Sequence, residues 1–166
     1  RLKKSKKIRK IVVCTTNLSS DDKFIKFLKE KNIEYFRGSD KDILQRLLDA
    51  AKFHKTDIII DVSGDKIYTD VDYVDKITEI FQNEEIDFIH GSNSKNEFNP
   101  SSLFIHGIIP GGFKTSALEK ICKSKKTTDT EDGYTEFFIK NETIKKKYIV
   151  QEINFEYTNK IKLDLD

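Results

Sequence analysis

The chain has 166 residues, 35% of them charged, but its 30 Lys and Arg nearly balance its 28 Asp and Glu and leave a formal net charge of +2. This length suits one domain that buries most of a full core. The charge balance excludes a disordered chain and a protein built mainly to coat nucleic acid. Because the sequence opens with Arg1 rather than Met, we expect a fragment of a longer protein.

The first apolar run, residues 11–14, is far too short for a secretion signal or a membrane span. We therefore expect a cytoplasmic protein with no membrane partner. Cys14 and Cys122 belong to no CxxC motif and have no His at ligand spacing, so we expect two reduced, structural thiols.

In the first half of the chain, apolar runs of strand length alternate with segments of helical periodicity. We expect strands at residues 11–14, 33–36, 57–62 and 86–90, the third covered on both faces because it holds three consecutive Ile. Helices are expected to begin at Ser19 and Ser39, in capping boxes with Asp22 and Asp42, and a third helix follows Asp65. The first helix is expected to bury a stripe of Phe24, Phe27 and Leu28. The second has a broad apolar face of Ile43, Leu44, Leu47, Leu48 and Ala51, and the third carries Val71, Val74, Ile77 and Phe81.

The second half of the chain is less regular. We expect a long polar loop at 91–102, an extended segment at 103–109, a turn at 110–112, helices at 115–122 and 130–140, and strands at 148–157 and 161–165. No repeat and no second domain is evident, so residues 1–166 are interpreted as a single domain, incomplete at both ends. The repeated strand–helix order predicts an α/β fold with a mostly parallel sheet between helix layers.

Three polar features are expected at the carboxyl edge of this sheet, where loops and helix N-termini gather. Arg37-Gly38-Ser39 joins a strand to a helix, so its backbone N–H groups can hold an anion. Gly64-Asp65 follows the triple-Ile strand, and Asp164 and Asp166 end the last strand. Acids on two strand ends suit Mg²⁺, which takes a few carboxylates together with phosphate oxygens. Each feature alone is also typical of an ordinary turn or a solvated terminus.

The order of the motifs along the chain is more specific than any one of them. They are Ile11-Val12-Val13-Cys14-Thr15-Thr16, Ser20-Asp21-Asp22, Tyr35-Phe36-Arg37-Gly38-Ser39, Asp42-Ile43-Leu44-Gln45-Arg46, Val62-Ser63-Gly64-Asp65, Ile109-Pro110-Gly111-Gly112, Asp129-Thr130-Glu131 and Lys162-Leu163-Asp164-Leu165-Asp166. This series resembles the cytidylyltransferase-like sugar nucleotidyltransferases, which include the spore coat polysaccharide biosynthesis group and, more distantly, CMP-KDO and CMP-sialic acid synthetases. The resemblance extends over almost the whole chain and is most distinctive at residues 35–46 and 62–65.

The resemblance implies a Rossmann-like nucleotide-diphospho-sugar transferase fold of the GT-A type. Such enzymes transfer a nucleotidyl group from CTP to a sugar or sugar phosphate and release pyrophosphate, here in the synthesis of surface polysaccharide precursors. It implies these roles by position: Asp65 and Asp166 as catalytic ligands of Mg²⁺, Arg37, Gly38, Ser39, Arg46 and Gly64 as nucleotide-binding residues, and Gly111, Gly112 and Glu131 facing the sugar. Because the metal neutralises charge on the leaving pyrophosphate, no catalytic His or Cys is needed.

Two departures from the family pattern limit the activity expected of this chain. The family begins with a strand and a Gly-, Arg- and Lys-rich loop that wraps the triphosphate, and this sequence starts beyond that loop. Gly64-Asp65 is followed by Lys66 and Ile67, where the family usually has Pro at the second position, and Lys66 is placed to pair with Asp65 and weaken metal binding. We therefore expect little or no transferase activity from the chain as it stands.

Two alternatives remain open. A GT-A glycosyltransferase that uses a nucleotide-sugar donor would carry a D-x-D motif, and Asp164-Leu165-Asp166 has that form. A non-catalytic binding module would use the basic residues between 3 and 10, but no aromatic residue is interleaved with them for stacking on bases, so we expect no nucleic-acid partner. The sequence leaves undetermined the sugar, the preference for CTP over another nucleotide, and the oligomeric state, a homodimer included.

Overall fold

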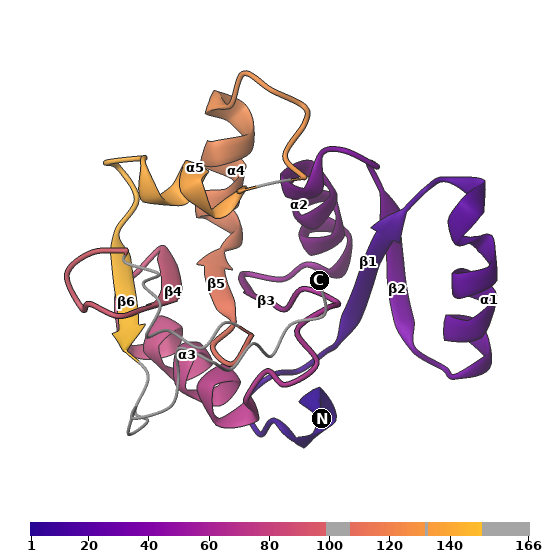
Figure 1. The fold of residues 1–166 in the computed structure, drawn as a ribbon, viewed down its shortest axis with the longest axis horizontal. Helices are drawn as coiled ribbons and strands as arrows, with labels where there is room; N and C mark the ends of the chain where they lie inside the picture. The colour runs from indigo at the N-terminus through magenta and orange to yellow at the C-terminus, as the bar shows by residue number, and fades with distance from the viewer. Residues whose placement is uncertain (99–106, 132, 151–166) are drawn as a thin grey trace. The chain divides into compact units, whose positions relative to one another are not determined.

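The computed structural model describes residues 1–98, 107–131 and 133–150. The chain forms two compact units, whose helices and strands are shown in Figure 1. Unit 1 comprises Arg1–Ile8, Ile58–Lys114 and Glu142–Asp166, and unit 2 comprises Arg9–Asp57 and Thr115–Asn141. Each unit is therefore assembled from segments that are far apart in the sequence.

Unit 2 contains a two-stranded parallel sheet and several helices. Its elements are β1 (Val12–Thr16), the 3-10 helix η2 (Ser19–Asp21), α1 (Asp22–Glu30), β2 (Glu34–Gly38), α2 (Ile43–His54), α4 (Thr115–Ser124) and α5 (Thr135–Ile139). The parallel register pairs Val12 with Glu34 and Thr16 with Gly38. α2 packs against both strands and against α4, which buries Leu44, Leu48 and Ala51 as predicted. The two strands confirm the predictions at 11–14 and 33–36, each with its end about two residues further along.

The predicted start of α1 was wrong in two respects. Ser19 opens a 3-10 turn instead of the α-helix. The N-cap residue of α1 is Asp21, whose side chain makes no capping hydrogen bond within the described residues. Phe24 and Phe27 are 43% and 47% exposed, whereas Ile25 and Leu28 are buried. The helix therefore turns its Ile25–Leu28 face to the core, because residues three apart share a face.

The predicted capping box at α2 was also shifted. α2 begins at Ile43, and the N-cap is Asp42, whose carboxylate accepts from the N–H of Gln45 at 3.1 Å. Ser39 lies before the cap, and its Oγ accepts from the N–H of Asp42 at 3.1 Å. A carboxylate at the N-cap satisfies an amide that the first helical turn leaves unpaired.

The described residues of unit 1 form a four-stranded sheet. Its elements are the 3-10 helix η1 (Leu2–Lys4), β3 (Ile58–Asp61), α3 (Val71–Asn83), β4 (Phe88–Ser92), β5 (Gly111–Lys114) and β6 (Lys146–Val150). The strand order is β3-β5-β4-β6, with β5 antiparallel to both of its neighbours and β4 parallel to β6. The prediction of a mostly parallel sheet is therefore confirmed only in part for the described strands: two of the four strand pairs are parallel, and β5 runs opposite to the other strands of its sheet.

The core of unit 1 lies where α3 packs on β3 and β5. Its buried residues are Ile77, Phe81, Ile89, Ile109 and Ile149, with Ile58 and Ile60 packed against them. All of β3 is only half-buried, so the expected cover on both faces is wrong. Gly112 allows the close approach of α3, since a Cβ there would lie 2.8 Å from Phe81 Cε2 and 2.9 Å from Ile77 Cγ2.

Several predictions in the second half of the chain need correction. Gly111 and Gly112 belong to β5 instead of a turn. The helix predicted at 130–140 is reduced to α5, and Gly133 precedes it with a left-handed φ of 65°. The strand predicted at 161–165 and the segment at 103–106 lie outside the described residues. In the part of the chain that the structure describes, no helix is long and apolar enough to cross a membrane.

Candidate functional site

The residues predicted to form the site fall on both units. Unit 2 holds Arg37, Gly38, Ser39, Arg46 and Glu131, and unit 1 holds Gly64, Asp65, Gly111 and Gly112. Asp166 lies outside the described residues, as does Asp164. Ser39 lies in the β2–α2 turn (residues 39–42), with Gly38 directly before it and Arg46 after it on α2. Gly64 and Asp65 lie in the β3–α3 turn (residues 62–70).

Arg46 closes the β2–α2 turn from α2. Its Nη1 donates to the backbone carbonyls of Ser39 at 2.7 Å and of Asp40 at 3.1 Å. A Cβ on Gly38 would lie 2.8 Å from Arg46 Cγ, so only glycine leaves room for this side chain. The buried Nε of Arg46 has no hydrogen-bond partner among the described residues. The structure thus brings Gly38, Ser39 and Arg46 together, and their predicted binding of a nucleotide stays a prediction.

The Arg37 side chain is committed to the connection after β1. Its Nε donates to the carbonyl of Thr16 at 2.9 Å, Nη2 to the carbonyl of Leu18 at 2.7 Å, and Nη1 to the carboxylate of Asp22 at 2.8 Å. These three contacts fix the guanidinium, whose side chain is 28% exposed. Arg37 therefore has a structural role, and its predicted contact with a nucleotide stays a prediction.

A hydroxyl and carboxylate cluster at the end of β1 was missed by the sequence predictions. Asp21 accepts hydrogen bonds from the hydroxyl groups of Thr15 and Thr16 and from the N–H of Thr16 at 3.0 Å. The Thr15 and Thr16 bonds lower the pKa of Asp21 from 3.8 to about 2, because they stabilise its ionised form. The signal in the sequence was the Thr-Thr pair followed closely by Asp-Asp.

A second cluster that sequence reasoning missed surrounds Asp42. Lys125 forms an ion pair with its carboxylate, and the two side chains are only 5% and 7% exposed. The fully buried Thr130 donates its hydroxyl to Asp42 Oδ1 at 3.2 Å. Glu131, the next residue, is exposed. No short motif indicates this cluster, because its members are more than 80 residues apart in the chain.

The β3–α3 turn is held by its backbone. The N–H of Lys66 donates to the carbonyl of Ser63, and that of Ile67 to the carbonyl of Asp65, both at 3.0 Å. The half-buried Asp65 carboxylate has neither a hydrogen bond nor an ion pair within the described residues, and the expected Lys66–Asp65 pair is absent there. Gly64 is exposed, with no atom within 4 Å of the place a Cβ would take.

Asp65 is the candidate metal ligand that the structure describes. A partnerless carboxylate fits a divalent cation that takes its other ligands from phosphate and water. Residues 1–98, 107–131 and 133–150 contain no group of three His, Cys, Asp or Glu that could hold a metal by itself. A metal at this turn would therefore depend on oxygens from a ligand or from residues that the structure does not describe.

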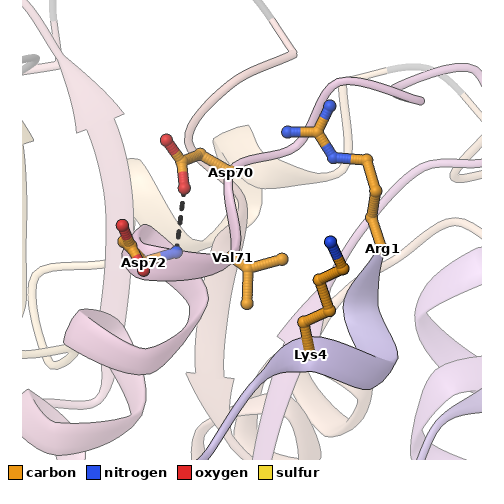
Figure 2. A pocket seen from close by; sticks show the side chains of 5 residues that line it. All are labelled: Arg1, Lys4, Asp70, Val71 and Asp72. Atoms are coloured by element: carbon orange, nitrogen blue, oxygen red, sulfur yellow. Dashed lines mark hydrogen bonds between the residues drawn. The ribbon is translucent and has the colours of Figure 1, made fainter.

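A pocket of about 430 Å³ lies in unit 1 where the β3–α3 turn leads into α3 (Figure 2). It is lined by Arg1, Lys4, Asp70, Val71 and Asp72. Asp70 caps α3 through the N–H of Asp72 at 2.8 Å. The pocket is lined by charged side chains of both signs, so the lining favours neither an anion nor a cation.

Two comparisons with known proteins match the whole chain. No protein-family model matches the chain. The whole chain is 29% identical to an uncharacterised protein, MJ1063, of Methanocaldococcus jannaschii, and spans 64% of its length. The whole chain also matches the solved structure of a cytidylyltransferase from Leptospira borgpetersenii serovar Hardjo-bovis, with a TM-score of 0.83 and 29% identity, and covers 67% of that chain. The chain thus corresponds to about two thirds of each of these proteins.

Proposed function

We propose that this chain belongs to a nucleotidyltransferase that transfers a cytidylyl group from CTP to a sugar or sugar phosphate and releases pyrophosphate. The observation that carries the proposal is the match of the entire chain to a cytidylyltransferase structure, with a TM-score of 0.83 and 29% identity. Because one fold can serve many reactions, the proposal also needs residues suited to the chemistry. The two turns provide them.

The β2–α2 turn is suited to phosphate or to another acceptor-rich part of a nucleotide. Arg46 Nη1 donates hydrogen bonds to the carbonyls of Ser39 and Asp40. In a trans peptide the N–H points away from the C=O, so the N–H groups of Asp40 and Lys41 face away from Arg46. Neither has an acceptor among the described residues. Free N–H groups ahead of a helix N-terminus favour bound anions.

The β3–α3 turn is suited to a metal-bound triphosphate. The Asp65 carboxylate is unpaired among the described residues, and no atom lies within 4 Å of the place that a Cβ on the neighbouring Gly64 would take. In the proposal Asp65 and Asp166 hold Mg²⁺, which would neutralise the charge on the leaving pyrophosphate. Asp65 would orient the triphosphate, and the chain would contribute no covalent intermediate.

The acceptor in this proposal is a sugar, which Glu131 of unit 2 would contact. The exposed carboxylate of Glu131 can accept hydrogen bonds from sugar hydroxyl groups. The product would be a cytidylyl-activated sugar, made in the cytoplasm as a precursor of surface polysaccharide.

Nucleotide titration of the chain tests the proposal without requiring turnover. Isothermal titration calorimetry with CTP, UTP, GTP and ATP, each with and without Mg²⁺, should show the tightest binding for CTP with Mg²⁺. Asp65→Asn should weaken that binding by about tenfold, equivalent to about 1.4 kcal/mol, and remove its dependence on Mg²⁺. Asp72→Asn is the matched control, because this exposed acid lies on α3 in the same unit.

The outcomes separate the candidate functions. Tighter binding of a UDP- or GDP-sugar than of CTP would identify a glycosyltransferase instead. Binding of none of these nucleotides would contradict the proposal. Unchanged CTP affinity in Asp65→Asn would show that the metal site lies elsewhere.

A further inference from the structure

The ion pair between Asp42 and Lys125 is unusually well buried for two charged side chains, at 7% and 5% exposure. Removing both charges from water costs free energy that their attraction only partly offsets. Replacing a buried ion pair by apolar residues of similar volume is often neutral or stabilising, so the pair by itself is weak evidence for a role in stability. A buried charged pair does, however, fix one geometry, since each partner must find the other.

The pair joins two segments of unit 2 that are distant in the sequence. Lys125 also donates to the carbonyl of Thr127 at 2.8 Å. The N–H of Thr130 donates to the carbonyl of Lys41 at 2.9 Å. The hydroxyl of Thr130 accepts from the N–H of Leu44 at 3.2 Å and donates to Asp42. Residues 125–130 are thus bonded to the start of α2 at several points and are called the 125–130 segment below.

Both ends of this connection lead to residues of the proposed site. Asp42 ends the β2–α2 turn, and its N–H is held by Ser39 Oγ. The same turn is closed by Arg46. On the other side, Thr130 directly precedes Glu131. A displacement of the turn therefore has a direct path to the residue proposed to face the sugar.

We propose that Asp42, acting through Lys125 and Thr130, is a positioning residue that couples the β2–α2 turn to Glu131. This inference rests on the proposed function, because it assigns the turn to the nucleotide and Glu131 to the sugar. Occupation of the turn by CTP then orders the 125–130 segment and sets Glu131 for the acceptor.

Hydrogen–deuterium exchange with and without CTP and Mg²⁺ tests the coupling in the full chain. In the unsubstituted chain, CTP should slow exchange at residues 38–46 and also at 127–131. Thr130→Val keeps the shape of the side chain and removes its hydroxyl. It should retain the slowing at 38–46 and lose it at 127–131. Thr130→Ser restores the hydroxyl and should restore both effects.

A second variant and a control guard against a simple loss of stability. The double variant Asp42→Asn with Lys125→Met removes both charges together, so no unpaired charge stays buried, and should lose the slowing at 127–131. Lys123→Met is the control, because Lys123 is 75% exposed and pairs with Glu119 on the same helix. It should respond to CTP as the unsubstituted chain does.

Two results would overturn the inference. If CTP slows exchange at 38–46 but never at 127–131 in the unsubstituted chain, the coupling is absent although the nucleotide site stands. If Thr130→Val and the double variant keep both effects, Asp42 and its partners are merely structural. If CTP slows exchange nowhere, the proposed function fails, and the positioning role fails with it.

Discussion

The β2–α2 turn and the β3–α3 turn both lead from a strand into a helix and both contain an aspartate, yet their environments differ. Asp42 accepts hydrogen bonds from a helix N–H and a hydroxyl and is paired with Lys125. Asp65 has no such partner among the described residues. Two similar carboxylates thus have opposite roles, because one is satisfied by the protein and the other is available to a ligand.

Replacing each aspartate by alanine should separate these roles most clearly. Asp42→Ala leaves the Lys125 ammonium buried and unpaired, so the free energy of unfolding should fall by about 3–5 kcal/mol. Asp65→Ala should change it by less than about 0.5 kcal/mol. Urea titration followed by circular dichroism measures both. Equal losses in the two variants would contradict the comparison.

Gly38, at the end of β2, and Gly64, in the β3–α3 turn, form a second matched pair. A Cβ on Gly38 would meet Arg46 Cγ at 2.8 Å, whereas nothing lies within 4 Å of one on Gly64. Gly38→Ala should therefore lower the free energy of unfolding by about 1–3 kcal/mol, as overpacking does. Gly64→Ala should leave it within about 0.5 kcal/mol of the parent chain. A tolerated Gly38→Ala would mean that Arg46 easily adopts another position.

Replacing Arg37 tests whether this residue stabilises the fold or binds a nucleotide. Arg37→Met removes three donated hydrogen bonds and should lower the free energy of unfolding by about 1–2 kcal/mol. The affinity of the folded chain for CTP should stay within about twofold of the parent value. Arg9→Met is the control, because Arg9 is exposed and makes no such contacts in the described chain. A large loss of CTP affinity without a loss of stability would restore the predicted nucleotide contact.

Asp21 should give the smallest effect, visible in the pH dependence of stability. Its pKa is about 2 in the folded chain and 3.8 ordinarily, so its ionised form favours folding above pH 4. That contribution is lost as the pH falls from 4 toward 2. The stability difference between the parent chain and Asp21→Asn should be constant above pH 4 and shrink toward pH 2. Urea midpoints from pH 2 to 6 would show it, and a difference independent of pH would contradict the assignment.

The elements were predictable where the apolar pattern is strong. β1, β2, α2 and α3 follow runs in which period and length agree, so tertiary contacts had little to decide. α1 shows the limit of this method. Phe24, Ile25, Phe27 and Leu28 form two overlapping stripes, and only packing decides that Ile25 and Leu28 face inward.

The site was predictable in part. The resemblance placed residues 37–39 and Arg46 beside the nucleotide. The structure brings Gly38, Ser39 and Arg46 into contact, and nucleotide binding there stays a prediction. The sequence did not indicate that Lys125 or Thr130 contacts Asp42, because such contacts depend on how distant segments meet. The direction of β5 was unpredictable for the same reason, since short apolar runs do not specify their partner strand.

The strand order β3-β5-β4-β6 has a consequence for a chain emerging from the ribosome. β1, α1, β2 and α2 are consecutive, so they can associate as soon as they are synthesised. β3 can pair only after β5 is synthesised, and β5 follows α3 and β4 in the chain. Until then β3 and β4 both expose unpaired edges. Translation slowed ahead of β5 would therefore prolong the state most prone to aggregation.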